Sequence, residues 1–239
     1  MFEEFVLAAS TADLGEEPAA RAHADAVEFR MDLANSPLDQ LASYDGALPL
    51  LVTNRASWEG GEADGTARYD ALSTAVDHDA VAAVDVELAA LRGTRPDDAE
   101  ESHAVALRET AREAGVDVVA SVHDFESTPE PAALVDLLAD AASEGDVGKL
   151  ATTATAPADA LAMLEATHEA TAAGHRVATM CMGEAGRHTR AVAPVYGSKI
   201  GYAPVEAADA TAPGQYSLAT LRRLVDDLRA SEAGDPSGD

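Results

Sequence analysis

The sequence is poor in lysine, which occurs only as Lys149 and Lys199, whereas arginine occurs fourteen times. Lys149 lies inside an apolar run, residues 147–152, where a charged side chain is costly to bury. Lysine can form an imine with a ketone and arginine cannot, so a lysine kept at such a position predicts chemical use of its amine. A snorkelling or salt-bridged lysine is the alternative interpretation.

Cysteine and aromatic residues are also scarce, and long apolar runs are lacking. Cys181 is the only cysteine, which excludes a disulfide framework and a thiolate metal cluster. No apolar run approaches the roughly 18 residues of a membrane-spanning helix, and the first residues lack the basic segment of a secretory signal. No glycine-rich nucleotide-binding motif is found either. We therefore expect a cytoplasmic protein with no membrane partner and a core of small aliphatic side chains.

Basic residues are outnumbered by acidic ones, with 16 Lys and Arg against 43 Asp and Glu and a formal net charge of -27. Such a charge repels nucleic acid and anionic membranes, so neither is expected as a partner. The acidic residues are spread along the chain, which together with the lack of lysine is typical of halophilic proteins. At molar salt the screening length is only about 3 Å, which makes this self-repulsion tolerable. An ordinary acidic protein is the alternative.

Short apolar runs alternate with alanine-rich, acid-studded segments along the chain. Strands are predicted at residues 5–10, 26–32, 48–55, 81–87, 116–123, 147–152, 176–182 and 198–202. Helices are predicted at residues 16–24, 38–44, 67–78, 98–114, 129–144, 157–173, 184–193 and 218–230, the fifth with capping-box spacing between Ser127 and Glu130. Eight β–α repeats in 239 residues predict a (β/α)8 TIM barrel, with a parallel eight-stranded barrel, as one domain over residues 1–230. An open doubly wound sheet is the alternative, and residues 231–239 are predicted to form a disordered acidic tail.

Within several predicted strands, charged residues alternate with apolar ones. Glu28, Arg30 and Asp32 fall on one face of the second strand, and Asp85 and Glu87 on one face of the fourth. When the apolar face meets the helices, these charges point into the barrel, where they are costly unless they are paired. A network of ion pairs around a ligand site explains them better than core packing does.

Lys149 and His123 lie on adjacent predicted strands, which run about 4.8 Å apart, so both side chains can serve one bound molecule. The pair suits imine formation followed by proton transfer, because an iminium stabilises the neighbouring carbanion and histidine moves protons near neutral pH. A hydrogen-bonded histidine at a strand end is the alternative interpretation of His123.

Around these residues the sequence resembles the type I 3-dehydroquinate dehydratases. The matching segments follow in the family's order: EFRMD at 28–32, RASWEGG at 55–61, DVE at 85–87, SVHDFESTP at 121–129, Lys149, MGEAGRHTR at 182–190, YGS at 196–198 and ATAPGQ at 210–215. The resemblance implies a (β/α)8 barrel, usually a homodimer, that acts without metal or organic cofactor. It implies a hydro-lyase of the shikimate pathway of aromatic amino acid biosynthesis, which converts the small-molecule substrate 3-dehydroquinate into 3-dehydroshikimate.

The resemblance also implies roles for single residues. Lys149 would form a Schiff base with the C3 ketone, His123 would take the C2 proton and protonate the departing C1 hydroxyl in a syn elimination, and Glu59 would orient this histidine. Substrate binding is implied for Glu28, Arg30, Arg55, Arg190, Thr211 and Gln215. Arg190 matches the arginine that binds the substrate carboxylate, with a solvated surface arginine as the alternative. The chain starts close to its first strand, so the N-terminal hairpin of longer members is expected to be reduced.

Two other classes of function are compatible with these residues. Another Schiff-base barrel, an aldolase or transaldolase, would need a phosphate site, which Gly183, Gly186 and Gly197 resemble only weakly. A non-catalytic barrel that binds a polyol carboxylate would leave the Lys149 and His123 pair unexplained. His188 is expected to be a bystander, and no role is predicted for Lys199.

Overall fold

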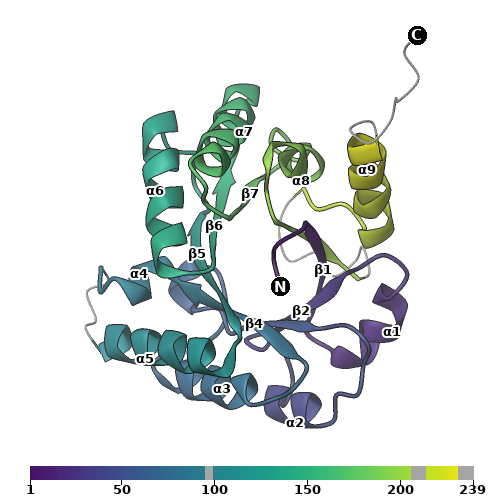
Figure 1. Ribbon diagram of the computed structural model, residues 1–239, viewed down its shortest axis with the longest axis vertical. Coiled ribbons are helices and arrows are strands. Elements are labelled where there is room, and N and C mark those ends of the chain that lie inside the picture. Colours follow the sequence, from purple (N-terminus) through teal and green to yellow (C-terminus); the bar gives the residue numbers. More distant parts are fainter. Residues whose placement is uncertain (95–98, 206–213, 231–239) are drawn as a thin grey trace.

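The computed structural model describes residues 1–94, 99–205 and 214–230. In this part of the chain, parallel strands form one eight-stranded sheet that curls into a nearly closed barrel with the helices around its outside (Figure 1). The strands follow the order β7-β6-β5-β4-β3-β2-β1-β8 along the sheet. They are β1 (Val6–Thr11), β2 (Ala26–Arg30), β3 (Leu50–Thr53), β4 (Val81–Glu87), β5 (Asp117–Asp124), β6 (Val147–Thr153), β7 (Val177–Met182) and β8 (Ile200–Pro204). The predicted (β/α)8 barrel is confirmed, and the open doubly wound sheet is wrong.

The helices follow the strands in alternation. They are α1 (Glu17–Ala20), α2 (Pro37–Ala42), α3 (Ala67–Val76), α4 (Leu88–Leu91), α5 (Ala99–Ala114), α6 (Pro131–Glu144), α7 (Pro157–Ala172), α8 (Thr189–Val192) and α9 (Leu218–Ala230). The described residues also form three short 3₁₀ helices, η1 (Leu14–Glu16), η2 (Ser57–Glu59) and η3 (Ala193–Tyr196). The prediction for residues 184–193 was too long, and α4 was missed because four residues are too few to show a helical period.

The capping box predicted between Ser127 and Glu130 is wrong. Helix α6 begins at Pro131, with Glu130 in an extended conformation at the N-cap and no side-chain cap. A residue before proline is pushed out of the helical region, and this applies both before Pro129 and before Pro131. The Ser127 backbone N–H instead donates to Asp124 Oδ1 at 2.9 Å, in the turn that follows β5.

Side chains alternate between the two faces of each strand and so contribute to two cores. One lies between the barrel and the helices, and the other lies inside the barrel. Phe29 and Val84 point outward and pack in one cluster with Tyr69 and Leu72 of α3. Gly148 allows α6 to approach β6 closely, because a Cβ there would lie 2.7 Å from the backbone nitrogen of Ala142. The lack of a side chain at Gly148 therefore lets α6 pack directly against the strand that carries Lys149.

The barrel closes between β7 and β8 without a β-ladder in the described residues. The backbone N–H of Lys199 donates to the carbonyl of Val177 at 2.7 Å, and the backbone N–H of Thr179 donates to Ser198 Oγ at 3.0 Å. The Ser198 side chain thus replaces part of the missing β-ladder between β7 and β8.

The residues before β1 lie across the N-terminal end of the barrel and form no helix or strand. Phe2 is buried in the interior cluster with Val6, and the N-terminus lies within the ring of strands in Figure 1. Lys199 Nζ donates to the carbonyl of Glu3 at 2.6 Å, and Arg176 pairs with the Glu3 carboxylate at 2.6 Å. Lys199 therefore has a structural role, holding this segment against the barrel.

The division of the chain into a domain over residues 1–230 and a tail stays a prediction. Residues 231–239, the predicted tail, lie outside the described residues. Among the helices that the structure describes, none is long and apolar enough to span a membrane.

Candidate active site

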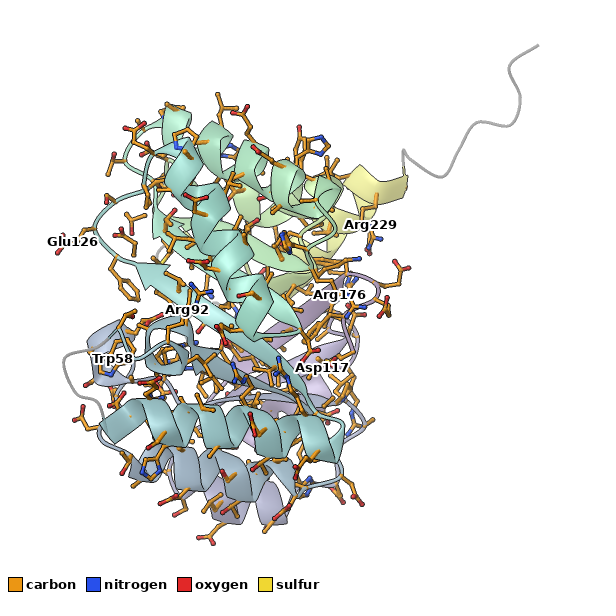
Figure 2. All side chains as sticks on the ribbon, turned by 60° about the vertical axis from the view of Figure 1, so that its left-hand side comes forward. Trp58, Arg92, Asp117, Glu126, Arg176 and Arg229 are labelled. Atoms are coloured by element: carbon orange, nitrogen blue, oxygen red, sulfur yellow. The ribbon has the colours of Figure 1, made fainter. Side chains whose placement is uncertain are left out.

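A pocket lies at the carboxyl ends of the strands. In Figure 2, Trp58 and Glu126, which follow β3 and β5, lie at this end of the barrel, and Asp117 and Arg176 lie at the opposite end. Eight of the nine predicted site residues line the pocket: Glu28, Arg30, Arg55, Glu59, His123, Lys149, Arg190 and Gln215. The ninth, Thr211, lies outside the described residues.

Lys149 projects from β6 into the barrel and is only 5% exposed. Its Nζ lies 3.0 Å from Asp85 Oδ2 and 3.9 Å from Glu28 Oε1, and 4.4 Å from the centre of the Tyr202 ring. The lysine is thus salt-bridged, as one interpretation of the sequence held. Because it also faces the pocket, this pairing describes its resting state and leaves its amine available to a ligand.

Arg55 organises the predicted network of buried ion pairs. Its Nη2 lies 2.7 Å from Asp85 Oδ1, and its Nη1 lies 3.0 Å from Glu87 Oε1 and donates to Ser121 Oγ at 2.7 Å. Burial acts to raise the pKa of Asp85, but Arg55 and Lys149 outweigh it and hold that pKa below its usual range. Asp85 is therefore a fixed anion, held between two cations.

A second cluster backs this network from outside the barrel. Arg68 Nη1 lies 2.7 Å from Glu87 Oε2, and its Nη2 lies 3.3 Å from Glu100 Oε2. The backbone N–H of Ala56 donates to Glu87 Oε1 at 3.1 Å, which anchors the loop leading to Glu59. Glu87 thereby links Arg55 in the pocket to Arg68 behind it.

His123 and Glu59 form a buried pair. His123 Nδ1 lies 2.9 Å from Glu59 Oε1. Burial and the neighbouring cations Arg55 and Lys149 lower the pKa of His123 well below its usual value, so the imidazole is neutral near pH 7. Burial also raises the pKa of Glu59 to about 8. Near pH 7 the carboxyl of Glu59 is therefore protonated beside a neutral imidazole.

The turn after Glu59 depends on a glycine. Gly60 has φ of 81°, a left-handed conformation, and a Cβ at this position would collide with the ring of Phe125. The Phe125 ring in turn stacks on the imidazole of His123, with centroids 6.0 Å apart and 12° between the planes. The lack of a side chain at Gly60 thus leaves room for the Phe125 ring to stack on His123.

Arg190 is a buried cation with no carboxylate partner among the residues that the structure describes. It is 5% exposed, and Nη1 contacts only Met180 Sδ at 3.7 Å, while Nε and Nη2 have no hydrogen-bond partner among the described residues. Burial lowers its pKa to about 10, which leaves it charged at neutral pH. In a chain with so many carboxylates, an unpaired buried guanidinium indicates a site for an external anion. The solvated surface arginine considered from the sequence is therefore wrong.

Thr189 fixes the backbone that carries Arg190. Its hydroxyl donates to the carbonyl of Gly186 at 2.8 Å and accepts from the backbone N–H of Cys181 at 2.8 Å. His188, expected to be a bystander, is exposed.

The remaining predicted binding residues are held by neighbours within the pocket. Glu28 accepts from Ser10 Oγ at 2.5 Å and from Thr53 Oγ1 at 3.2 Å. Arg30 makes a two-point contact with Asp32, from Nε at 2.9 Å and Nη2 at 2.6 Å. Strand β2 ends at Arg30, so Asp32 lies beyond the strand and not on its face as predicted.

Some pocket residues were not identified from the sequence. Asp85 was placed in the barrel by its alternation but given no role at the site, although it contacts Lys149. Ser10 and Tyr202 were missed, and their only signal is an inward position on β1 and β8. The described residues contain no group of three or more His, Cys, Asp or Glu that could hold a metal ion.

A parallel barrel with a charged pocket at the carboxyl ends of its strands defines the class of (β/α)8-barrel enzymes. A family profile, that of type I 3-dehydroquinase, matches residues 6–232. The chain therefore belongs to the type I 3-dehydroquinase family, as its motifs suggested.

Individual relatives support this assignment. A 3-dehydroquinate dehydratase of the halophilic archaeon Haloarcula marismortui is 62% identical over 230 residues, which cover 96% of this chain and 98% of the relative. The crystal structure of 3-dehydroquinate dehydratase from Geobacillus kaustophilus has a TM-score of 0.81 at 26% identity, covering 95% of this chain and 92% of the other. A type I enzyme from Clostridium difficile, solved with covalently modified comenic acid, has a TM-score of 0.79 at 25% identity, covering 97% and 95%.

Proposed function

We propose that the protein dehydrates 3-dehydroquinate to 3-dehydroshikimate through a Schiff base on Lys149. The observation that carries this proposal is the convergence of Lys149, His123 and Arg190 in one pocket of a type I 3-dehydroquinase. Family membership makes the protein a hydro-lyase of the shikimate pathway, and it favours this activity over an aldolase or a non-catalytic binding barrel.

The first stage is imine formation. Lys149 passes one proton of its ammonium group to His123, and the resulting neutral amine attacks the C3 carbonyl carbon. A C–N bond forms and the carbonyl π pair moves to oxygen, which takes that proton from His123. A second proton from the nitrogen lets this oxygen leave as water, and the nitrogen keeps one proton, so the product is the iminium. Asp85 is held ionised by Arg55, so it cannot supply these protons, whereas His123 is neutral in the same pocket and can relay them.

The second stage is elimination. The iminium draws electrons from C2, which lets His123 remove the C2 proton. The electron pair forms the C1–C2 double bond as the C1 hydroxyl leaves, and His123 returns the proton to that hydroxyl on the same face. Hydrolysis of the imine then releases the product and regenerates Lys149.

The ionisation of Glu59 should set which nitrogen of His123 can act as the base. Below pH about 8, the protonated carboxyl of Glu59 donates to Nδ1, which leaves the ring proton on Nε2. Above that pH the carboxylate accepts from Nδ1–H, and the lone pair of Nε2 becomes free to take a proton. We therefore expect kcat/KM to rise with pH through about 8.

Glu59→Gln provides the matched control for this pH profile. Its amide oxygen can accept from Nδ1–H at every pH, so the acid limb should disappear. A wild-type profile that stays flat through this range, or one that the variant shares, would contradict the assignment.

Arg190 is proposed to bind the substrate carboxylate. A planar guanidinium with two free donor atoms matches a planar carboxylate, and Lys149 and His123 lie in the same pocket. Glu28, Arg30, Arg55 and Gln215 are proposed to hold the ring hydroxyls, together with Thr211 of the undescribed segment.

Replacing Arg190 by methionine should raise KM by roughly 10- to 100-fold, the usual cost of a lost charged hydrogen bond. Because two donor atoms of the buried guanidinium have no partner in the described part of the chain, the same change should raise the thermal stability of the substrate-free protein. Steady-state kinetics and thermal unfolding test both, with the exposed Arg223→Met on α9 as control. An unchanged KM would exclude this role.

Turnover of 3-dehydroquinate in molar potassium chloride tests the proposed function itself. The product contains a conjugated enone, so its formation can be followed by ultraviolet absorbance. Folded protein that leaves 3-dehydroquinate unchanged but acts on a sugar phosphate would overturn the proposal. The homodimer, the cytoplasmic location and the salt requirement of a halophilic protein remain predictions.

A further inference from the structure

A buried hydroxyl in the pocket has no partner within the described protein. Tyr202 projects inward from β8 and is 5% exposed, and its hydroxyl oxygen is buried without a hydrogen bond among the described residues. The residue lines the same pocket as Lys149. Buried hydroxyl groups are nearly always hydrogen-bonded, so an exception at a ligand site calls for an explanation.

The other hydroxyl groups close to Lys149 are all satisfied. Ser10 donates to Glu28 at 2.5 Å, Thr53 donates to Glu28 at 3.2 Å, and Ser121 donates to Asp85 at 2.6 Å. Both oxygens of Glu28 and of Asp85 therefore already have partners, Lys149 being the second at Asp85. The Tyr202 hydroxyl takes part in none of these bonds, so among the described residues it remains an uncommitted donor.

Tyr202 lies close to the amine of Lys149, the group that attacks the substrate. The Lys149 Nζ lies 4.4 Å from the centre of the Tyr202 ring, so the phenol covers one side of the amine. Tyr202 pairs in register with Ala8 on β1, two residues before Ser10. Burial, together with Glu28 and Asp85, raises the pKa of Tyr202 well above its usual value. The hydroxyl therefore keeps its proton and can only donate or accept a hydrogen bond.

We propose that the Tyr202 hydroxyl is a further catalytic group, which donates a hydrogen bond to the substrate oxygen on the carbon that Lys149 attacks. The inference rests on the proposed Schiff-base function. As the C–N bond forms, the carbonyl π pair moves onto this oxygen, and a fixed donor stabilises the growing negative charge. Tyr202 keeps its proton throughout. The proton that the oxygen gains comes from the amine through His123.

Tyr202→Phe tests this role, because it keeps the ring over Lys149 and removes only the hydroxyl. We expect kcat/KM, and the rate at which borohydride traps substrate on Lys149, to fall by on the order of 100-fold. The thermal stability of the substrate-free variant should be equal or higher, since no hydrogen bond within the described protein is lost. A merely structural tyrosine would give the reverse pattern, with lower stability and an unchanged trapping rate.

Tyr44→Phe is the matched control. Its hydroxyl donates to the carbonyl of Leu48 at 2.6 Å, away from the pocket, so this change should lower stability and leave the trapping rate as in wild type. A wild-type trapping rate in Tyr202→Phe would overturn the proposal for Tyr202 alone. Failure of the wild-type protein to form any adduct would overturn the Schiff-base function itself, so the two failures are distinct.

Discussion

Replacing Lys149 by alanine should abolish turnover of 3-dehydroquinate, with kcat falling by on the order of 10⁵-fold or more. The pocket holds no second amine that could take its place, because Lys199 lies at the opposite end of the barrel against Glu3. Lys149→Arg should be equally inactive. It keeps a cation near Asp85 and so separates the loss of imine chemistry from the loss of charge.

Borohydride reduction in the presence of 3-dehydroquinate, followed by peptide mass mapping, locates the imine. We expect one adduct, at Lys149, and none in the arginine variant. Lys199→Ala serves as the control, which should keep full adduct formation if the protein remains folded. An adduct at Lys199, or none in the wild type, would rule out the mechanism.

Replacing His123 by alanine should lower kcat by about 10²- to 10⁴-fold, the range typical of a lost general acid–base group. Lys149 remains in place, so the imine should still form slowly and accumulate, because its elimination is now the slower stage. Mass spectrometry after borohydride reduction would detect this accumulation during turnover.

The exposed His188→Ala is the control for the histidine prediction and should behave as wild type. Turnover of the His123 variant at the wild-type rate would refute its role as the proton carrier. Loss of both turnover and adduct would instead show that imine formation itself requires His123.

Much of the barrel could be predicted because strand and helix periods differ. Strand β4 and helix α9 have the predicted bounds, since each carries a clear period and ends at a change of composition. Element ends set by tertiary contacts were less accessible. The start of α6 depends on two prolines and on the Asp124 turn, which override the local capping pattern.

Site residues could be predicted where a pattern within one strand places them in the barrel. They were harder to predict where their role depends on contacts between distant parts of the sequence. Glu28 and Asp85 were placed in the barrel by alternation, and Lys149 by its rarity. The pairing of Glu59 with His123 came only from a resemblance, because the two are 64 residues apart in sequence. That the Tyr202 hydroxyl has no partner among the described residues could not be foreseen at all, since it depends on how the side chains around it pack.

The buried charges alternate in sign from the pocket to the outer helices. Lys149, Asp85, Arg55, Glu87, Arg68 and Glu100 follow one another through successive ion pairs. Dissolved ions screen the acidic surface but cannot enter between these pairs. The molecule therefore has two sets of charges, one at the surface that responds to dissolved salt and one in the interior that is screened far less. Substitutions of acidic surface residues that adapt the protein to a different salt concentration would therefore leave the buried ion pairs around Lys149 unchanged.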